Sequence, residues 1–145
     1  TTLWECWNGL GSRNHHMFSS VSEFFYWYVA GITPSPDTVA YEKTLFRPML
    51  NGTLLSARAH IRTVRGRVAI AWEKRDGGFA VQVQVPVSCT GELLLPRAWR
   101  GQDTLGILAE DGQAVQDNMI VCEDPVRDEV RVILESGAYH FTAGT

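Results

Sequence analysis

The chain has 145 residues, of which 13 are basic and 16 acidic, so its formal charge is −3. This balance argues against a protein that binds nucleic acid by neutralising phosphates. A hydrophobic content of 45% and a charged content of 20% exclude a disordered or fibrous chain. The longest mainly apolar stretch, residues 18–32, is interrupted by serines and a glutamate and is too short to span a bilayer, so no membrane segment is predicted.

A helix is predicted to begin between Asn14 and Ser20 and to end at Gly31. Its apolar side chains at helical spacing are Val21, Phe24, Phe25, Tyr28 and Val29. The segment from Ser20 to Glu23 has the form of a capping box. Gly31 can adopt the left-handed conformation after the last turn, and Pro34 prevents the helix from continuing.

This helix is apolar around nearly its whole circumference, because Tyr26, Trp27 and Ala30 fill much of the opposite face. Such a helix is usually buried on more than one side. A single sheet cannot cover all of its large aromatic side chains, which are Phe24, Phe25, Trp27 and Tyr28. We therefore expect self-association through this helix or a rearranged packing of it.

Beyond residue 37 the hydrophobic pattern changes to the period of two that is typical of strands. Between residues 55 and 62, apolar side chains alternate with Ser56, Arg58, His60 and Arg62. Further strands are predicted at residues 68–72, 79–85, 93–95, 107–109, 130–134 and 138–142, with tight turns at residues 75–78 and 110–112. The predicted fold class is mainly β, an antiparallel sandwich of about eight strands preceded by one helix.

The basic residues between positions 58 and 67 form a cluster that alternates along the chain and lacks interleaved aromatic residues. They are Arg58, His60, Arg62, Arg65 and Arg67. This pattern indicates a solvated outer face of the sheet rather than a surface for nucleic acid.

The cysteines and histidines do not suggest a metal centre. Cys6, Cys89 and Cys122 are too far apart for a disulfide framework or a zinc spacing, and we interpret them as ordinary thiols. His15 and His16 are adjacent, so on a helix they would point about 100° apart and could not chelate on one face. We predict no metal and no cofactor.

The strongest candidate for chemistry is Glu5, which lies between Trp4 and Trp7. Aromatic faces stack on the apolar side of a pyranose, and partial desolvation tunes a carboxylate, so this arrangement suits a sugar site. The alternative is that Glu5 is a solvated loop residue and that the tryptophans pack for stability. Spacing alone leaves both interpretations open.

Three segments near the N-terminus carry a family resemblance: residues 1–7 (TTLWECW), 12–24 (SRNHHMFSSVSEF) and 28–32 (YVAGI). They resemble the closing part of the catalytic domain of bacterial and fungal α-L-rhamnosidases. Residues 46–48, 55–59, 66–67, 94–96 and 136–141 are similar to that family's C-terminal β-sandwich. The loop of residues 8–11 is shorter than in many members.

The resemblance implies a glycosidase that releases terminal α-L-rhamnosyl groups from a rhamnoside substrate with inversion. It implies that Glu5 is the general base that activates water and that His15 contacts a sugar hydroxyl. Trp4, Trp7 and Asn14 complete the expected substrate-binding residues. An inverting site holds its two carboxyl groups about 6.5–9.5 Å apart, so that a water molecule fits beside the anomeric carbon.

The resemblance also predicts a division of the chain. Residues 1–36 would be the last segment of the catalytic α/α barrel, whose remnant is the helix, and residues 37–145 would be the accessory β-sandwich. In the family the general acid comes from earlier helices of the barrel, so the 145 residues alone are expected to be inactive.

A second hypothesis is a free-standing carbohydrate-binding or interaction module without catalysis. Exposed aromatic residues on the sandwich, Trp72 or Trp99, would then form the site. For Trp72 core packing is the favoured alternative, because this residue alternates in phase with Val68 and Ile70.

Overall fold

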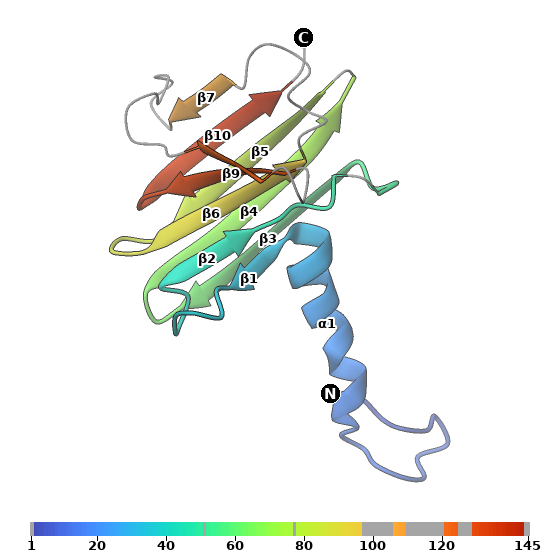
Figure 1. Cartoon of the computed structure of the whole chain (residues 1–145). Helices are drawn as coiled ribbons and strands as arrows, with labels where there is room; N and C mark the ends of the chain where they lie inside the picture. The colour runs from blue at the N-terminus through green and yellow to red at the C-terminus, as the bar shows by residue number, and fades with distance from the viewer. Residues whose placement is uncertain are drawn as a thin grey trace.

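The protein is a sandwich of two five-stranded sheets (Figure 1). The computed structural model describes residues 2–50, 52–76, 78–96, 106–109, 121–124 and 129–143. The first sheet contains, in spatial order, β1 (Ile32–Pro34), β2 (Lys43–Phe46), β6 (Thr90–Pro96), β9 (Glu129–Leu134) and β8 (Val121–Asp124). The second contains β3 (Ser56–Thr63), β4 (Gly66–Arg75), β5 (Gly78–Val85), β10 (Gly137–Ala143) and β7 (Gly106–Ala109).

The prediction of a mainly β sandwich is confirmed, and every strand predicted from the alternation is present. The described residues also form β1, β2 and β8, which were not predicted. β1 and β2 are too short, at 3 and 4 residues, to show a clear alternation. β2 pairs with β6 in parallel, whereas the other strand pairs in the described part of the chain are antiparallel.

The pleat of the strands places the core between the two sheets. Ala57, Ala59 and Ile61 of β3 face inward, and the residues between them are exposed, as predicted. The largest fully buried side chains come from both sheets: Phe46, Leu93, Val132 and Leu134 from the first, and Val68, Ile70, Trp72, Phe79, Val81 and Phe141 from the second. β4 and β5 form the hairpin predicted at residues 75–78, with Arg75 opposite Gly78. The turn predicted at residues 110–112 lies outside the described residues.

The helix runs from His16 to Ala30 and changes its geometry twice. A 3₁₀ turn (His16–Ser19) leads into α1 (Ser20–Phe24), which continues as a π-helical segment (Phe25–Ala30). The capping-box prediction is wrong, because the chain is already helical before Ser20. Its hydroxyl instead donates to the carbonyl oxygen of Met17 at 2.8 Å.

The end of the helix lies where the sequence predicts it. Gly31 has φ +87°, and its N–H donates to the Tyr26 carbonyl at 2.9 Å, which closes the π-helical turn. A β-carbon at this position would collide with the backbone carbonyl of Arg47. Glycine is thus required both for the backbone conformation and for the close approach of the 46–48 segment. The polypeptide enters the first sheet at Ile32, before the boundary predicted at residue 36.

Most of the helix projects away from the sandwich (Figure 1). Only its last turn is packed: Ala30 is buried, and the Val29 carbonyl accepts a hydrogen bond from the Trp72 indole at 3.0 Å. Phe24, Phe25 and Tyr28 are 47%, 56% and 59% exposed. The prediction that one sheet cannot cover these aromatic residues is therefore confirmed.

The described residues contain no helix that is both long and apolar enough to cross a membrane. Cys6 is an exposed free thiol and Cys89 a buried one.

Burial, and secondarily the nearby Glu135 carboxylate, raises the pKa of the Tyr139 phenol, whose hydroxyl donates to the Glu135 carbonyl at 3.0 Å.

Candidate functional site

Residues 3–15, the loop before the helix, fold back on themselves so that two backbone segments lie antiparallel and hydrogen-bond to each other. The Glu5 N–H donates to the Ser12 carbonyl at 2.8 Å, and the His15 N–H donates to the Leu3 carbonyl at 2.7 Å. Between them the chain turns through Gly9, which has φ +76°. The short loop thus aligns the segment around Glu5 with the segment that leads into the helix.

This loop brings the two principal candidate residues, Glu5 and His15, close together. Glu5 Oε2 accepts a hydrogen bond from the Ser12 N–H at 2.9 Å and lies 3.6 Å from His15 Nδ1. The side chains of Glu5 and His15 are 43% and 28% exposed. One side of the carboxylate is thus held by the backbone while water reaches the other, which suits a group that must accept a proton from water.

Gly11 is part of this arrangement, although the sequence analysis did not single it out. It has φ +81°, and a β-carbon there would lie 2.7 Å from Glu5 Oε2. A side chain at this position would displace the carboxylate. Only the glycine-rich spacing of residues 8–11 could have indicated this role.

The two tryptophans beside Glu5 differ in their surroundings. Trp4 carries the Arg13 guanidinium 5.3 Å from its ring centroid, a cation–π contact that the sequence analysis missed. The side chain of Trp7 is fully exposed, so it does not pack for stability within the described chain. Asn14 is also exposed, and its backbone N–H donates to the Ser12 hydroxyl at 3.2 Å. The structure therefore joins Glu5 and His15 directly and leaves Trp7 and Asn14 open to solvent.

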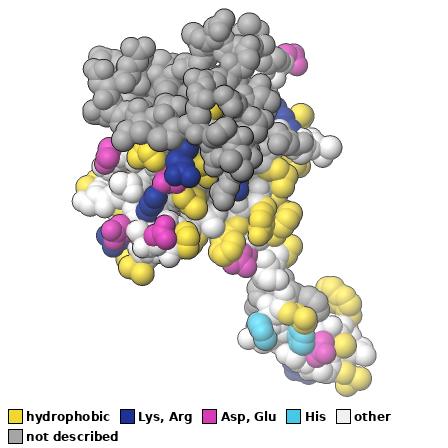
Figure 2. All heavy atoms as spheres, in the orientation of Figure 1, with side chains coloured by type: hydrophobic (Ala, Val, Ile, Leu, Met, Phe, Trp, Pro, Cys, Tyr) yellow, Lys and Arg dark blue, Asp and Glu magenta, His cyan; other side chains and the backbone are white. Residues whose placement is uncertain are grey.

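The carboxylate of Glu5 is the only one in residues 1–19. We call residues 2–17 the N-terminal lobe. Figure 2 shows the lobe, with its histidine side chains and the Glu5 carboxylate, standing apart from the sandwich. Within the described ranges, no group of three or more His, Cys, Asp or Glu residues could hold a metal ion. The lobe thus supplies one carboxylate and no second carboxylic acid of its own.

The tryptophans proposed for a binding module are not available on the described surface. Trp72 is 2% exposed and belongs to the core, so the packing interpretation is confirmed. Trp99 lies outside the described residues.

The fold defines the class of the chain as a β-sandwich domain preceded by a helix and by a loop that carries the Glu5 carboxylate. Residues 31–105 match the family described as bacterial alpha-L-rhamnosidase C-terminal domain. The chain belongs to this family of C-terminal domains of α-L-rhamnosidases, and the resemblance seen in the sequence is confirmed.

Individual relatives agree with this assignment. An alpha-L-rhamnosidase from Streptomyces avermitilis is 35% identical over 79% of this chain, and one from Alteromonas sp. is 30% identical over 66% of it. The solved alpha-L-rhamnosidase from Dictyoglumus thermophilum superposes on 94% of the chain with a TM-score of 0.72 at 28% identity. The S. avermitilis structure, complexed with L-rhamnose, superposes on 90% with a TM-score of 0.68 at 30% identity. The chain spans only 12% and 11% of the two curated relatives, and 15% and 11% of the two solved chains.

Proposed function

We propose that this chain is the C-terminal part of a longer enzyme that hydrolyses terminal α-L-rhamnosyl groups with inversion. The observation that supports this most is the Glu5 carboxylate, held by the Ser12 N–H at 2.9 Å and flanked by His15 at 3.6 Å, in a chain of the rhamnosidase C-terminal family. The isolated 145 residues are expected to be inactive.

In this proposal Glu5 is the general base. Water attacks the anomeric carbon on the face opposite the aglycone, and its proton passes to the Glu5 carboxylate as the bond to the leaving oxygen breaks. The leaving oxygen takes a proton from a carboxylic acid elsewhere in the longer enzyme, since Glu5 is the only carboxylate of its lobe. The exposed side of Glu5 leaves room for that second group and for the attacking water.

The surrounding residues would bind the sugar. His15 lies close enough to Glu5 to orient a hydroxyl beside the reacting carbon. Trp7 and Asn14, which are both exposed, could offer an aromatic face and an amide to the ring. Trp4, which is 46% exposed and carries Arg13 against its ring, would contribute a further aromatic surface.

The stereochemistry of the reaction tests this proposal. The full-length protein is incubated with 4-nitrophenyl α-L-rhamnopyranoside, and the anomeric proton of the released sugar is followed by NMR. We expect the β-anomer to appear first and the α-anomer only as mutarotation proceeds. Initial release of the α-anomer, or no hydrolysis by the full-length protein, would contradict the proposal.

We further propose that the 145-residue chain self-associates through its projecting helix. Exposed apolar patches favour association, and here Val21, Phe24, Phe25 and Tyr28 are all exposed. Light scattering should detect a dimer whose population rises with concentration, and Phe24→Glu should shift it to monomer. The control is Val64→Glu, an equally drastic change at an exposed apolar position in the β3–β4 turn. A monomer at all concentrations, with the helix ordered, would refute self-association.

A further inference from the structure

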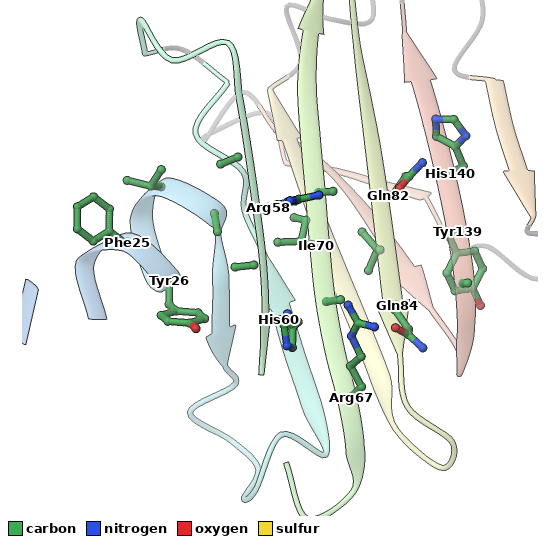
Figure 3. Close-up of a pocket in the computed structure, with 18 residues that line it drawn as sticks. Phe25, Tyr26, Arg58, His60, Arg67, Ile70, Gln82, Gln84, Tyr139 and His140 are labelled. Carbon is green, nitrogen blue, oxygen red and sulfur yellow. The ribbon is translucent and has the colours of Figure 1, made fainter. Parts of the chain in front are cut away.

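The outer face of the second sheet is hollowed. The hollow has a volume of about 1310 Å³ and extends over β3, β4, β5 and β10, with Phe25 and Tyr26 of the helix at its β3 side (Figure 3). None of its lining residues is acidic. This face is separate from the loop that carries Glu5.

Strand register explains the shape of the hollow. One row across the sheet places Arg58, Ala71, Gln82 and His140 side by side, and the next places His60, Ala69, Gln84 and Ala138. In these two rows β4 therefore contributes only the methyl groups of Ala69 and Ala71, whereas β3 and β5 contribute long polar side chains. The next outward residue along β4 is Arg67, which also lines the hollow. The hollow is thus a trough along β4, with Arg58 and His60 of β3 on one side and the amides of Gln82 and Gln84 of β5 on the other. Because adjacent strands lie about 4.8 Å apart, these two sides are separated by roughly 10 Å.

The charge on this face is not balanced within the described chain. Arg58 and Arg67 line the hollow, and neither has an ion-pair partner among the described residues. Arg62 lies directly opposite Arg67 in the β3–β4 register, and like charges in opposed positions destabilise a strand pair. Glu73 is further along the same face of β4 and is paired with Arg75 at 3.7 Å.

The β10 side of the hollow carries an unsatisfied polar atom. His140 lines the hollow from β10, and its Nε2 atom is buried without a hydrogen-bond partner in the described structure. Buried polar atoms are nearly always paired, so an unpaired one calls for an additional group. Because this atom has almost no accessible surface, a group in the hollow could bond to it only after the imidazole turned outward.

We propose that this face binds an acidic saccharide. The carboxylate groups would be held by Arg58 of β3 and Arg67 of β4, and the hydroxyls by the amides of Gln82 and Gln84 of β5. The apolar face of a pyranose ring would rest on the methyl groups of Ala69 and Ala71. A volume above the usual 300–1,000 Å³ of small-molecule sites leaves room for more than one sugar ring.

Other occupants agree less well with these features. The trough has polar sides and a narrow methyl floor, whereas the centre of a protein interface is depleted of charge and enriched in aromatic residues. A nucleic acid would meet a chain whose net charge is −3. The proposal does not depend on catalysis by Glu5, and its test involves no hydrolysis.

Calorimetric titration of the 145-residue chain tests the proposal with three probes: digalacturonate, its neutral counterpart galactobiose, and sulfate. We expect saturable binding of digalacturonate, and binding of the other two that is weaker by about tenfold or more, since one charged hydrogen bond accounts for roughly that factor. Arg58→Gln should weaken digalacturonate binding by a similar factor. Arg75→Gln, which removes the same charge from the same face outside the hollow, should leave binding unchanged.

A second variant, Ala71→Leu, fills the trough without changing charge and should also weaken binding. Thermal unfolding of each variant shows that the sandwich is intact. If galactobiose bound as tightly as digalacturonate, the charge would not be recognised, and if sulfate did so, the sugar would not be recognised. Either result would overturn the proposal. Absence of saturable binding would overturn the proposal as well. That result is expected if the face is not a sugar site but a surface on which another part of a longer protein packs.

Discussion

Replacing Glu5 by Gln in the full-length protein is expected to slow the release of rhamnose by about 10²–10⁴-fold, the usual contribution of a general base. Glutamine keeps the shape of the side chain, and its amide oxygen can still accept the Ser12 N–H, but it cannot take a proton from water. The loop and the sandwich should therefore remain folded while hydrolysis fails. Steady-state kinetics with 4-nitrophenyl α-L-rhamnopyranoside would measure this as a fall in kcat.

Two controls separate loss of the base from a structural defect. Glu23→Gln changes an exposed glutamate on α1 and should leave kcat unaltered. Azide is a nucleophile that needs no deprotonation, so added azide should restore cleavage in Glu5→Gln and give the β-rhamnosyl azide. Turnover of the variant near that of the unaltered enzyme would remove Glu5 from the mechanism.

Replacing Trp72 by Ala is expected to lower the free energy of unfolding by about 3–5 kcal/mol, the range for a large buried aromatic residue. Trp72 is 2% exposed, and its indole donates to the Val29 carbonyl at 3.0 Å. It fills the core between the sheets and also anchors the last turn of the helix. Urea unfolding of the 145-residue chain, followed by circular dichroism, measures the loss.

A graded series tests this double role of Trp72. Trp72→Phe keeps most of the apolar volume but removes the indole N–H, so it should lower stability by about 1–3 kcal/mol through the lost hydrogen bond and the smaller ring. Leu55→Ala, at a residue that is exposed beside β3, should change stability by no more than about 0.5 kcal/mol. A decrease below about 1 kcal/mol for Trp72→Ala would show that the sandwich does not depend on this residue.

The sandwich was predictable wherever a strand was long enough to show its period. From β3 to β5 every second residue is an inward apolar side chain almost without interruption, and the Asp-Gly sequence after β4 favours the hairpin. The end of the helix was predictable because Gly31 and Pro34 leave few backbone alternatives. β1 and β2 were missed because their 3 and 4 residues, ITP and KTLF, show neither an alternation nor a wholly apolar run.

The candidate site was predictable in its residues but not in its geometry. The family resemblance pointed to Glu5 and His15 by their motifs. Their separation of 3.6 Å depends on backbone hydrogen bonds between distant residues of the loop, and on the absence of a side chain at Gly11. Neither feature has a sequence period that could predict it.

The sequence by itself determined the extent of the helix, the longer strands with their core residues, and the family. Local backbone preferences and the alternation of apolar residues act between residues a few positions apart, so they can be recognised in a single amino-acid sequence. Only the tertiary structure decided which strands became neighbours, and thus that Arg58, Ala71, Gln82 and His140 form one row. The hollow face and the exposed aromatic helix arise from pairings between residues far apart in the chain, which local patterns do not encode.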